Sequence, residues 1–466
     1  MPSEVLLRGG TLVTAADMTE GDLLIRDGKI AEIGQALQTS GQVLDARDHL
    51  VMPGGIDTHV HLAHPIERLG IQTADDFYTG TVAAACGGVT TIVDFALQRQ
   101  GHSLTKTLDG RLSSVRDEAV IDYSLHIIVT DVRAETLGEI PKLVGEGFPS
   151  FKVMMTYADK KVDDAGLLRV LEATSEHGGI VYIHCENDAA VTHLISRYLS
   201  RGDTGPHYHE RSRPAVVEAE ATYRAICLAE LVDAPICIAH VTNAGSVSHI
   251  SAARERGLPV VAETCPQYLT LTNDVFDPSH GFEAAKFVCS PPMRGKPHGD
   301  ALWSALRTGG IQQVASDHAP FRFSDQKTLG RHDFTCIPNG LPGIETRLPL
   351  VFTKGVTAGL IDASRFVELV STNPAKIFGM YPTKGSLDIG ADADLIVMDP
   401  HQEVEIDHGT LHSAMDYSPY QGMPVRGFPT WTISRGEVIV ERGEPQGDRG
   451  RGLLVMRSPV TREGLP

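Results

Sequence analysis

The feature that most limits how this chain can fold is a regular alternation of short β-rich apolar runs with longer amphipathic stretches. The amphipathic stretches carry apolar residues at spacings of three and four, which is typical of helices packed on one face. The expected strands number eight and cover residues 56–62, 90–95, 123–130, 151–156, 180–185, 236–241, 260–263 and 313–316. The expected helices include residues 75–85, 165–174, 218–231 and 245–255. This pattern predicts an α/β fold with a (β/α)8 barrel of the TIM type over residues 53–385, because an open doubly wound sheet commonly has only about six strands.

Short β-like runs also occur at both ends of the chain. Near the N-terminus they cover residues 5–7, 11–13, 22–25 and 29–33, and near the C-terminus residues 394–398, 431–434 and 438–441. Neither group has enough strands to bury a sheet face alone. We therefore expect residues 1–52 and 386–446 to join into one composite small β-sandwich domain beside the barrel. Residues 447–466 are rich in glycine and arginine and are expected to form a loosely held C-terminal arm.

The charge and the cysteine content narrow the possible partners and the compartment. Lys and Arg total 41 against 59 Asp and Glu, a formal net charge of −18, which argues against nucleic acid or an anionic membrane as the partner. The seven cysteines are odd in number, scattered and mostly within apolar runs, so we interpret them as reduced core residues. The N-terminus lacks the pattern of a secretion leader, and no apolar run is long enough to span a bilayer. These features predict a soluble cytoplasmic protein.

Residues able to bind metal ions follow several of the expected strands. His59 and His61 are two positions apart at the end of the first strand, so both imidazoles lie on the same side of it. His184 and His240 end two later strands, and Asp317 follows the last one. An isolated histidine is more often a hydrogen-bonded core residue than a ligand. Because the carboxyl ends of barrel strands meet in one pocket, the series as a whole predicts a metal site.

Lys152 is unusual because it lies inside the apolar run Phe151–Met155, where burying an unpaired ammonium group costs several kcal/mol. A depressed pKa would let the neutral amine take up carbon dioxide and form a carbamate, whose two oxygens can bridge two metal ions. Two such ions, about 3.5–4 Å apart, lower the pKa of a bound water towards about 7 and polarise a carbonyl. The sequence therefore indicates a two-metal hydrolase in which Asp317 keeps one oxygen free for proton transfer.

A set of short motifs resembles those of the hydantoinase/dihydropyrimidinase group of cyclic amidohydrolases. The motifs are GGIDTHVHL at 54–62, AACGGVTTIVDF at 84–95, SFKVMMTY at 150–157, ETCPQYL at 263–269, CSPPMR at 289–294, SDHAPF at 316–321, IPNGLPGIETRLPL at 337–350 and NPAKIFG at 373–379. The resemblance implies a barrel with two zinc ions bridged by a carboxylated lysine. It also implies hydrolytic ring opening of a cyclic amide, a 5-substituted hydantoin or a dihydropyrimidine, to an N-carbamoyl amino acid by a metal-bridged hydroxide.

Carried over position by position, the resemblance implies a role for each of a set of residues. His59, His61 and Asp317 would hold one zinc ion, His184 and His240 the other, and carboxylated Lys152 both. Asp317 would also act as the general base that takes a proton from water and gives it to the leaving nitrogen. Tyr157 would stabilise the tetrahedral oxyanion, and Ser290 and Asn339 would read the amide groups of the ring, largely through backbone atoms. Without the metal series, these last three would be interpreted as a loop aromatic and two turn residues.

Two loops depart from the usual pattern of the group, so the resemblance does not determine which substrate fits. Residues 63–71 differ from the Gly/Phe-rich segment common there, and residues 158–162 are slightly shortened; such loops cover the exocyclic group of the ring. An allantoinase or another cyclic-imide hydrolase is an alternative, whereas Ala63 and His64 stand where a dihydroorotase has an arginine. A non-catalytic dihydropyrimidinase-like scaffold is less favoured, because all six ligand positions are present. The habit of the group suggests a homo-oligomer, either a tetramer or a dimer.

Overall fold

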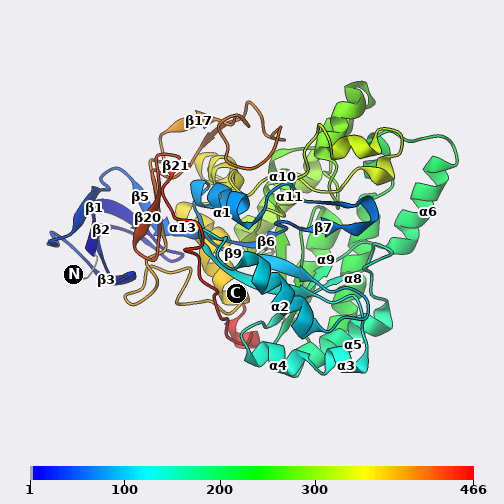
Figure 1. Ribbon diagram of the computed structural model, residues 1–466, viewed down its shortest axis with the longest axis horizontal. Helices are drawn as coiled ribbons and strands as arrows, with labels where there is room; N and C mark the ends of the chain where they lie inside the picture. The colour runs from blue at the N-terminus through cyan, green and yellow to red at the C-terminus, as the bar shows by residue number, and fades with distance from the viewer. Residues whose placement is uncertain (1–3) are drawn as a thin grey trace.

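The protein consists of a barrel of parallel strands surrounded by helices, with a smaller β domain beside it (Figure 1). A computed structural model describes residues 4–466. Within that range, eight strands pair in chain order, each parallel to its neighbours. They are β6 (Gly55–Val60), β9 (Val89–Leu97), β10 (Asp122–Ile128), β11 (Ser150–Met154), β12 (Ile180–His184), β13 (Ile236–Ile238), β14 (Val260–Thr264) and β15 (Gln313–Val314). The ring closes where Val60 pairs in parallel with His318, just after β15. The predicted TIM-type fold is confirmed, and every expected strand is present.

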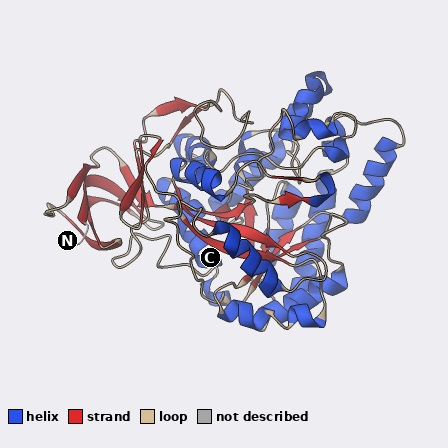
Figure 2. Ribbon diagram, viewed as in Figure 1, coloured by secondary structure: helices blue, strands red, loops and turns tan. Residues whose placement is uncertain are grey.

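Helices alternate with these strands and cover the outside of the barrel (Figure 2). Those that correspond to the four expected stretches are α1 (Phe77–Cys86), α5 (Asp164–Ser175), α8 (Ala215–Leu231) and α9 (Ala244–Glu255). Three of the four begin at a side chain that accepts a hydrogen bond from a free backbone N–H of the first turn: Asp76, Asp163 and Asn243. In the described part of the chain, no helix combines the length and the apolar character that a bilayer crossing needs.

The barrel strands are apolar because both of their faces are covered. Every residue of β10, β11 and β12 is buried. A polar side chain in such a strand therefore needs a partner inside the protein. His126 on β10 has two, because its Nδ1 lies 2.6 Å from Ser150 Oγ and its Nε2 lies 3.0 Å from the Thr58 carbonyl oxygen. His126 is thus a core residue, whereas Lys152 on β11 is one of the buried groups that lack a hydrogen-bond partner within the described chain.

The small β domain is built from both ends of the chain. Its N-terminal strands are β1 (Glu4–Val13), β2 (Met18–Arg26), β3 (Lys29–Gly34), β4 (Gln42–Asp45) and β5 (Leu50–Pro53), and its C-terminal strands are β16 (Leu395–Met398), β19 (Trp431–Ser434), β20 (Glu437–Glu441) and β21 (Glu444–Pro445). The two groups join where β16 pairs antiparallel with β5. The domain has an apolar core of its own, separate from the barrel core, with Leu23, Ile25 and Ile433 at its centre. The prediction that the two ends combine is confirmed.

The C-terminal segment is held firmly, so the prediction of a loose arm is wrong. The Tyr123 amide donates to the Leu453 carbonyl at 3.0 Å, and the Val455 amide donates back to the Tyr123 carbonyl at 2.8 Å. Arg457 is buried against the same end of the barrel, where its Nη1 donates to Ser150 Oγ at 2.8 Å. Glycine and arginine content is a poor guide here, because this segment is ordered by strand-like pairing and by the buried side chains of Arg457 and Val460.

Candidate active site

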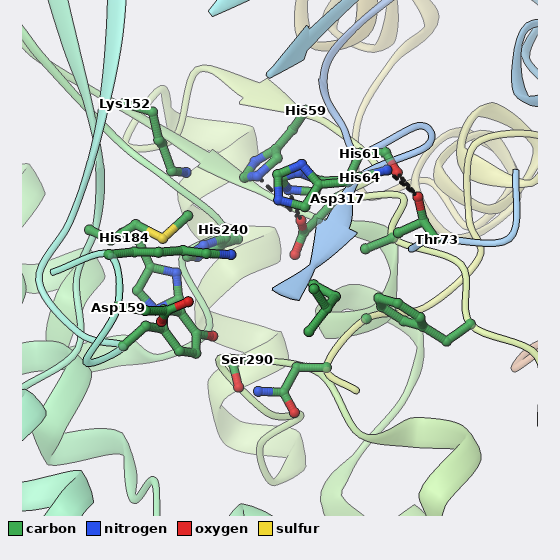
Figure 3. A pocket seen from close by; sticks show the side chains of 18 of the residues that line it. His59, His61, His64, Thr73, Lys152, Asp159, His184, His240, Ser290 and Asp317 are labelled. Atoms are coloured by element: carbon green, nitrogen blue, oxygen red, sulfur yellow. Dashed lines mark hydrogen bonds and ion pairs between the residues drawn. The ribbon is translucent and has the colours of Figure 1, made fainter. Parts of the chain in front are cut away.

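All of the residues singled out from the sequence line one cavity at the carboxyl ends of the barrel strands. They are His59, His61, Lys152, Tyr157, His184, Ser290, His240, Asp317 and Asn339. In Figure 3, the four imidazoles, Lys152 and Asp317 surround a common space, and Ser290 lies across that space from them. The side chains come from different strands and loops that are distant in sequence, and the barrel brings them together because parallel strands end at the same face.

Asp317 lies against the two histidines of the first strand. Its Oδ1 is 3.2 Å from His59 Nε2 and 3.4 Å from His61 Nε2. One nitrogen or oxygen atom from each of His59, His240 and Asp317 lies within 4.8 Å of the others. The two-residue spacing of the histidines therefore places both rings on the same side, as the strand period predicts.

Buried carboxylates orient two of the imidazoles. His59 Nδ1 lies 2.8 Å from Glu263 Oε1, and the Tyr182 hydroxyl donates to the other oxygen of Glu263. His184 Nε2 lies 2.8 Å from Glu186 Oε2, which also forms an ion pair with the buried Arg213. Each carboxylate occupies one ring nitrogen and leaves the other for the cavity, the usual arrangement around a metal-binding histidine. Burial raises the pKa of Glu263 to about 8, against the lowering effects of the Tyr182 hydrogen bond and Lys152.

Neither carboxylate was identified from the sequence. Glu263 ends the apolar run 260–263, so the argument applied to Lys152, a charged residue inside a buried strand, would have found it. Glu186 lies two residues after His184, just beyond the end of β12. Burial raises the pKa of Glu186, but the guanidinium of Arg213 and the contact with His184 outweigh burial and hold it at about 2. Arg213 was not visible as a partner because it is far along the chain.

Lys152 has no hydrogen-bond partner among the described residues. Its side chain is 1% exposed, and its Nζ lies 4.1 Å from the centroid of the Tyr182 ring and 5.4 Å from that of Phe95. Burial lowers the pKa of Lys152, and the Glu263 and Asp317 carboxylates oppose that shift. An amine surrounded by aromatic faces on one side and metal-type ligands on the other is suited to conversion into a carbamate.

Two histidines that line the cavity also have an unsatisfied ring nitrogen. His61 Nδ1 and His240 Nδ1 are buried and lack a hydrogen-bond partner within residues 4–466. Buried polar atoms are normally paired, and those that are not call for an ion or a ligand. The set of four imidazoles, one carboxylate and one buried amine has the nitrogen and oxygen donors that zinc accepts. The residues present therefore fit a two-metal centre.

Three residues of the cavity adopt left-handed backbone conformations that non-glycine residues rarely use. The φ angles are 76° at Tyr157, 35° at His240 and 50° at Asp317. Such conformations cost roughly 1–3 kcal/mol each and occur mainly where surrounding structure holds a functional side chain. Here each directs a side chain that lines the cavity.

Ser290 and Asn339 are carried by two loops that pair with each other. The Gly340 amide donates to the Val288 carbonyl at 3.0 Å, which joins the segment around Asn339 to the segment around Ser290. Ser290 Oγ lies 3.2 Å from His209 Nε2. Tyr157 is next to this wall, and burial raises the pKa of its hydroxyl while Arg213 opposes the shift. The three residues whose roles rested on resemblance alone thus lie on one side of the cavity.

Three further residues line the cavity that the sequence alone does not identify. His64, which the sequence leaves unassigned, is buried in the cavity wall and its ring centroid lies 4.9 Å from that of His61. Arg68 and Lys160 also line the cavity, from the two loops that depart from the usual pattern. His318 does not line it, because its Nε2 lies 3.1 Å from Asp75 and its Nδ1 accepts from the Gly343 amide.

Comparison with known proteins places the chain in a family. Residues 50–439 match the amidohydrolase family. The chain belongs to that family. A D-hydantoinase of Streptomyces coelicolor is 44% identical over 98% of this chain and 99% of its own length. A D-hydantoinase of Geobacillus stearothermophilus is 45% identical over 97% of this chain and 96% of its own.

Solved structures show the same relationship for this amidohydrolase. A crystal structure of a dihydropyrimidinase from Brevibacillus agri NCHU1002 superposes with a TM-score of 0.96 at 43% identity and covers 99% of this chain and 100% of that one. A D-hydantoinase structure superposes with a TM-score of 0.95 at 44% identity and covers 98% of this chain and 99% of that one. The predicted membership in the hydantoinase/dihydropyrimidinase group and the prediction of a hydrolase are confirmed.

Proposed function

We propose that this amidohydrolase opens the ring of a cyclic amide, a 5-substituted hydantoin or a dihydropyrimidine, and releases an N-carbamoyl amino acid. The observation that carries the proposal is the convergence of four imidazoles, Asp317 and an unpartnered buried Lys152 in one cavity. The named hydantoinases that resemble the chain over nearly its full length support the same substrate class.

A two-zinc centre fits these residues. We assign His59, His61 and Asp317 to one ion, His184 and His240 to the other, and the carboxylated side chain of Lys152 to both. The ions, when bound, supply a water of lowered pKa and polarise the amide carbonyl. Zinc is inferred from the donor set and from the resemblance, because other first-row ions compete for imidazole and carboxylate ligands.

The chain's own residues account for the proton transfers and the charge that develops. Asp317 Oδ1 faces His59 and His61, so Oδ2 is the atom we assign to take a proton from the attacking water. The same carboxyl gives that proton to the ring nitrogen when the C–N bond breaks, so that one water is consumed for each ring opened. The Tyr157 hydroxyl donates to the oxyanion of the tetrahedral intermediate, an interaction whose removal typically costs about 3–4 kcal/mol.

Ser290 and Asn339 orient the ring. They lie on paired loops at the wall beside Tyr157, where backbone N–H groups are able to donate to the carbonyl of a cyclic amide and backbone C=O groups to accept from its N–H. Holding the ring in this way places its carbonyl over the metal ligands and reduces the entropy lost on reaching the transition state.

The test is a substrate panel with zinc-loaded protein. We expect hydantoins or dihydrouracil to be opened, with the N-carbamoyl product detected by chromatography, and His59→Ala to abolish the reaction. Preferential opening of allantoin or of phthalimide would assign the site to an allantoinase or an imide hydrolase. Protein that retains well under one zinc per chain, with the same rates before and after His59→Ala, would overturn the proposal in favour of a scaffold.

The handedness of the substrate is a separate question. An L-hydantoinase (dihydropyrimidinase) from Arthrobacter aurescens also superposes on this chain, with a TM-score of 0.88 at 31% identity. Since D- and L-hydantoinases share this fold, the loops around the cavity, rather than the barrel, decide which enantiomer fits. The same panel run with separated enantiomers measures the preference.

A further inference from the structure

Beyond the metal ligands, the cavity contains two cationic side chains. Arg68 lies on the 3-10 turn Glu67–Leu69, within the hairpin formed by β7 (Pro65–Ile66) and β8 (Ile71–Gln72). Lys160 lies in the turn that follows β11. Both line the cavity together with the apolar side chains of Ile66, Met154 and Phe321. The protein as a whole has a net charge of −18, so two cationic side chains in this cavity differ from its overall charge.

Lys160 is placed in the cavity by its turn. Its amide and that of Lys161 both donate to the Tyr157 carbonyl, at 2.9 and 2.7 Å, which holds the turn against the end of β11. The neighbouring Lys161 belongs to a different groove, where its Nζ pairs with Asp188 at 2.5 Å. Adjacent lysines therefore have opposite orientations, one towards the cavity and one away from it.

No carboxylate of the described residues forms an ion pair with either cation, although Asp159 and Glu67 favour the charged form of Lys160. Among the ion pairs of residues 4–466, Glu67 is taken by Arg99 at 2.7 Å and Asp188 by Lys161, and neither Arg68 nor Lys160 takes part in one. Arg68 Nη1 donates to the Thr335 carbonyl at 2.9 Å, which steadies the guanidinium without cancelling its charge. Asp159 lines the cavity as well, but its side chain is exposed and forms no ion pair with Lys160.

Burial makes the charge of Lys160 costly for the free enzyme, whereas Arg68 is exposed. Burial lowers the pKa of Lys160, which Asp159 opposes and the charge of Arg68 reinforces. An anion that binds beside Lys160 and Arg68 reduces the repulsion between these two like charges. The cavity lining thus combines apolar side chains and two cations with the residues of the reacting centre.

We propose that the substrate ring carries a substituent with a short aliphatic stem and a terminal carboxylate, which Lys160 and Arg68 bind. This inference rests on the proposed ring-opening function and adds the chemical class of the substituent. The ring lies over Asp317 and the imidazoles, the stem packs against Ile66, Met154 and Phe321, and the carboxylate reaches the cations. The product is then the N-carbamoyl derivative of an acidic amino acid.

The test compares two ligands that differ only in charge. Hydantoin with a 5-carboxyethyl substituent and its neutral analogue with a 5-carbamoylethyl substituent have nearly the same shape. We measure their equilibrium binding to the zinc-loaded protein by calorimetry and their kcat/KM for ring opening. Because a charge-assisted hydrogen bond contributes about 1.5–3 kcal/mol, we expect the carboxylate to be preferred by roughly tenfold or more.

Variants of the two cations show which residue causes the preference for the carboxylate ligand. Lys160→Met should reduce the ratio to about threefold or less, and Arg68→Met should reduce it in part, since a tenfold change corresponds to about 1.4 kcal/mol. Lys161→Met is the matched control, because it removes the same charge one residue away, and should leave the ratio unchanged. Equal binding of both ligands by the unaltered protein, or a ratio that survives Lys160→Met, would overturn the inference.

The two proposals fail in different ways. Selective binding of the carboxylate without opening of either ring would refute the hydrolytic function and keep the cationic subsite. Opening of both rings at equal kcat/KM with equal affinity would keep the hydrolytic function and refute the subsite. A carboxylate preference that weakens as salt rises from 0.05 to 0.5 M supports the two cations, since partly exposed charges are screened.

Discussion

The Nδ1 atom of His59 lies 2.8 Å from Oε1 of Glu263, so a carboxylate buried in the barrel determines which nitrogen of this imidazole faces the cavity. Glu263 is fully buried and also accepts from the Tyr182 hydroxyl. His59 at the end of β6 is therefore held by Glu263 near the end of β14, and Glu263 is held in turn by Tyr182.

Replacement of this carboxylate should weaken metal retention. We expect Glu263→Gln to lower zinc affinity or activity by about 10- to 100-fold, because carboxylates behind metal-binding histidines typically contribute that much. Zinc content after dialysis against a graded chelator series measures the effect. Tyr182→Phe is the control, since it removes only the hydroxyl and keeps the carboxylate on His59, and should have a smaller effect. Equal zinc content in Glu263→Gln and the unaltered protein would contradict the role of Glu263.

Lys152 should be required for both metal retention and activity. Lys152→Ala removes the only buried amine of the cavity floor that lacks a partner among the described residues. We expect loss of bound zinc and of ring opening, and partial recovery of both when a short-chain carboxylic acid is added to take the place of the carbamate. Lys152→Arg should stay inactive under the same addition, because its bulk fills the space. Full activity of Lys152→Ala without additives would refute the carbamate bridge.

Lys327 should act as a positioning residue for the substrate loops. Its Nζ donates to the carbonyl oxygens of Val288, Pro338 and Gly340, each at 2.8 Å, and so joins the segments that carry Ser290 and Asn339. We expect Lys327→Met to raise KM more than it lowers kcat, because the loops hold the ring while the metal ligands are untouched. Steady-state kinetics separates the two constants, and zinc content serves as the control. A fall in kcat with an unchanged KM would argue against this role.

The same lysine gives a pH dependence of stability. Burial lowers the pKa of Lys327 to about 7 from the ordinary 10.5. The unfolded chain therefore binds more protons than the folded protein between those two values, so the free energy of unfolding that this group contributes rises with pH across that window and is constant below about 7. Chemical denaturation of the unaltered protein and Lys327→Met at pH 7 and 9.5 should show a difference that increases with pH. A difference independent of pH would contradict the shift.

Removal of the C-terminal segment should destabilise the barrel. Deleting residues 447–466 removes the pairing of Leu453 and Val455 with Tyr123 and uncovers the surface under the buried Arg457. We expect Tm to fall by several degrees, since a loss of about 1 kcal/mol shifts Tm by roughly 1 °C in a chain of this size and the deletion removes several hydrogen bonds and a buried arginine. Arg449→Met is the control, because it breaks an exposed pair with Glu118 and an exposed contact with the Tyr78 ring, and each such interaction contributes about 0–1 kcal/mol. An unchanged Tm after the deletion would restore the prediction of a loose arm.

The eight strands, the main helices and the composite β domain followed from the sequence because their signal is local. A strand covered on both faces reads as a continuous apolar run, and a helix that packs on the barrel reads as apolar residues three and four apart. The metal series was visible for the same reason, since His59, His184 and His240 each end such a run, and Lys152 interrupts one.

The residues that support and shape the site could not be found in this way. Glu263 reaches His59 and Arg213 reaches Glu186 across the fold, and nothing in the local sequence marks the pairing. The orientation of Lys160 towards the cavity and of Lys161 away from it depends on a turn held by the Tyr157 carbonyl. The firm attachment of residues 447–466 depends on Tyr123, more than three hundred residues earlier in the chain.

The amino-acid sequence by itself determined the barrel, the series of metal-type ligands and the family, because hydrophobic periodicity and short motifs are written along the chain. Only the tertiary structure decided which polar groups are paired, which cations remain free in the cavity and which ring nitrogens face it. Those properties depend on distances between residues remote in sequence, and the closure of the barrel is what establishes them.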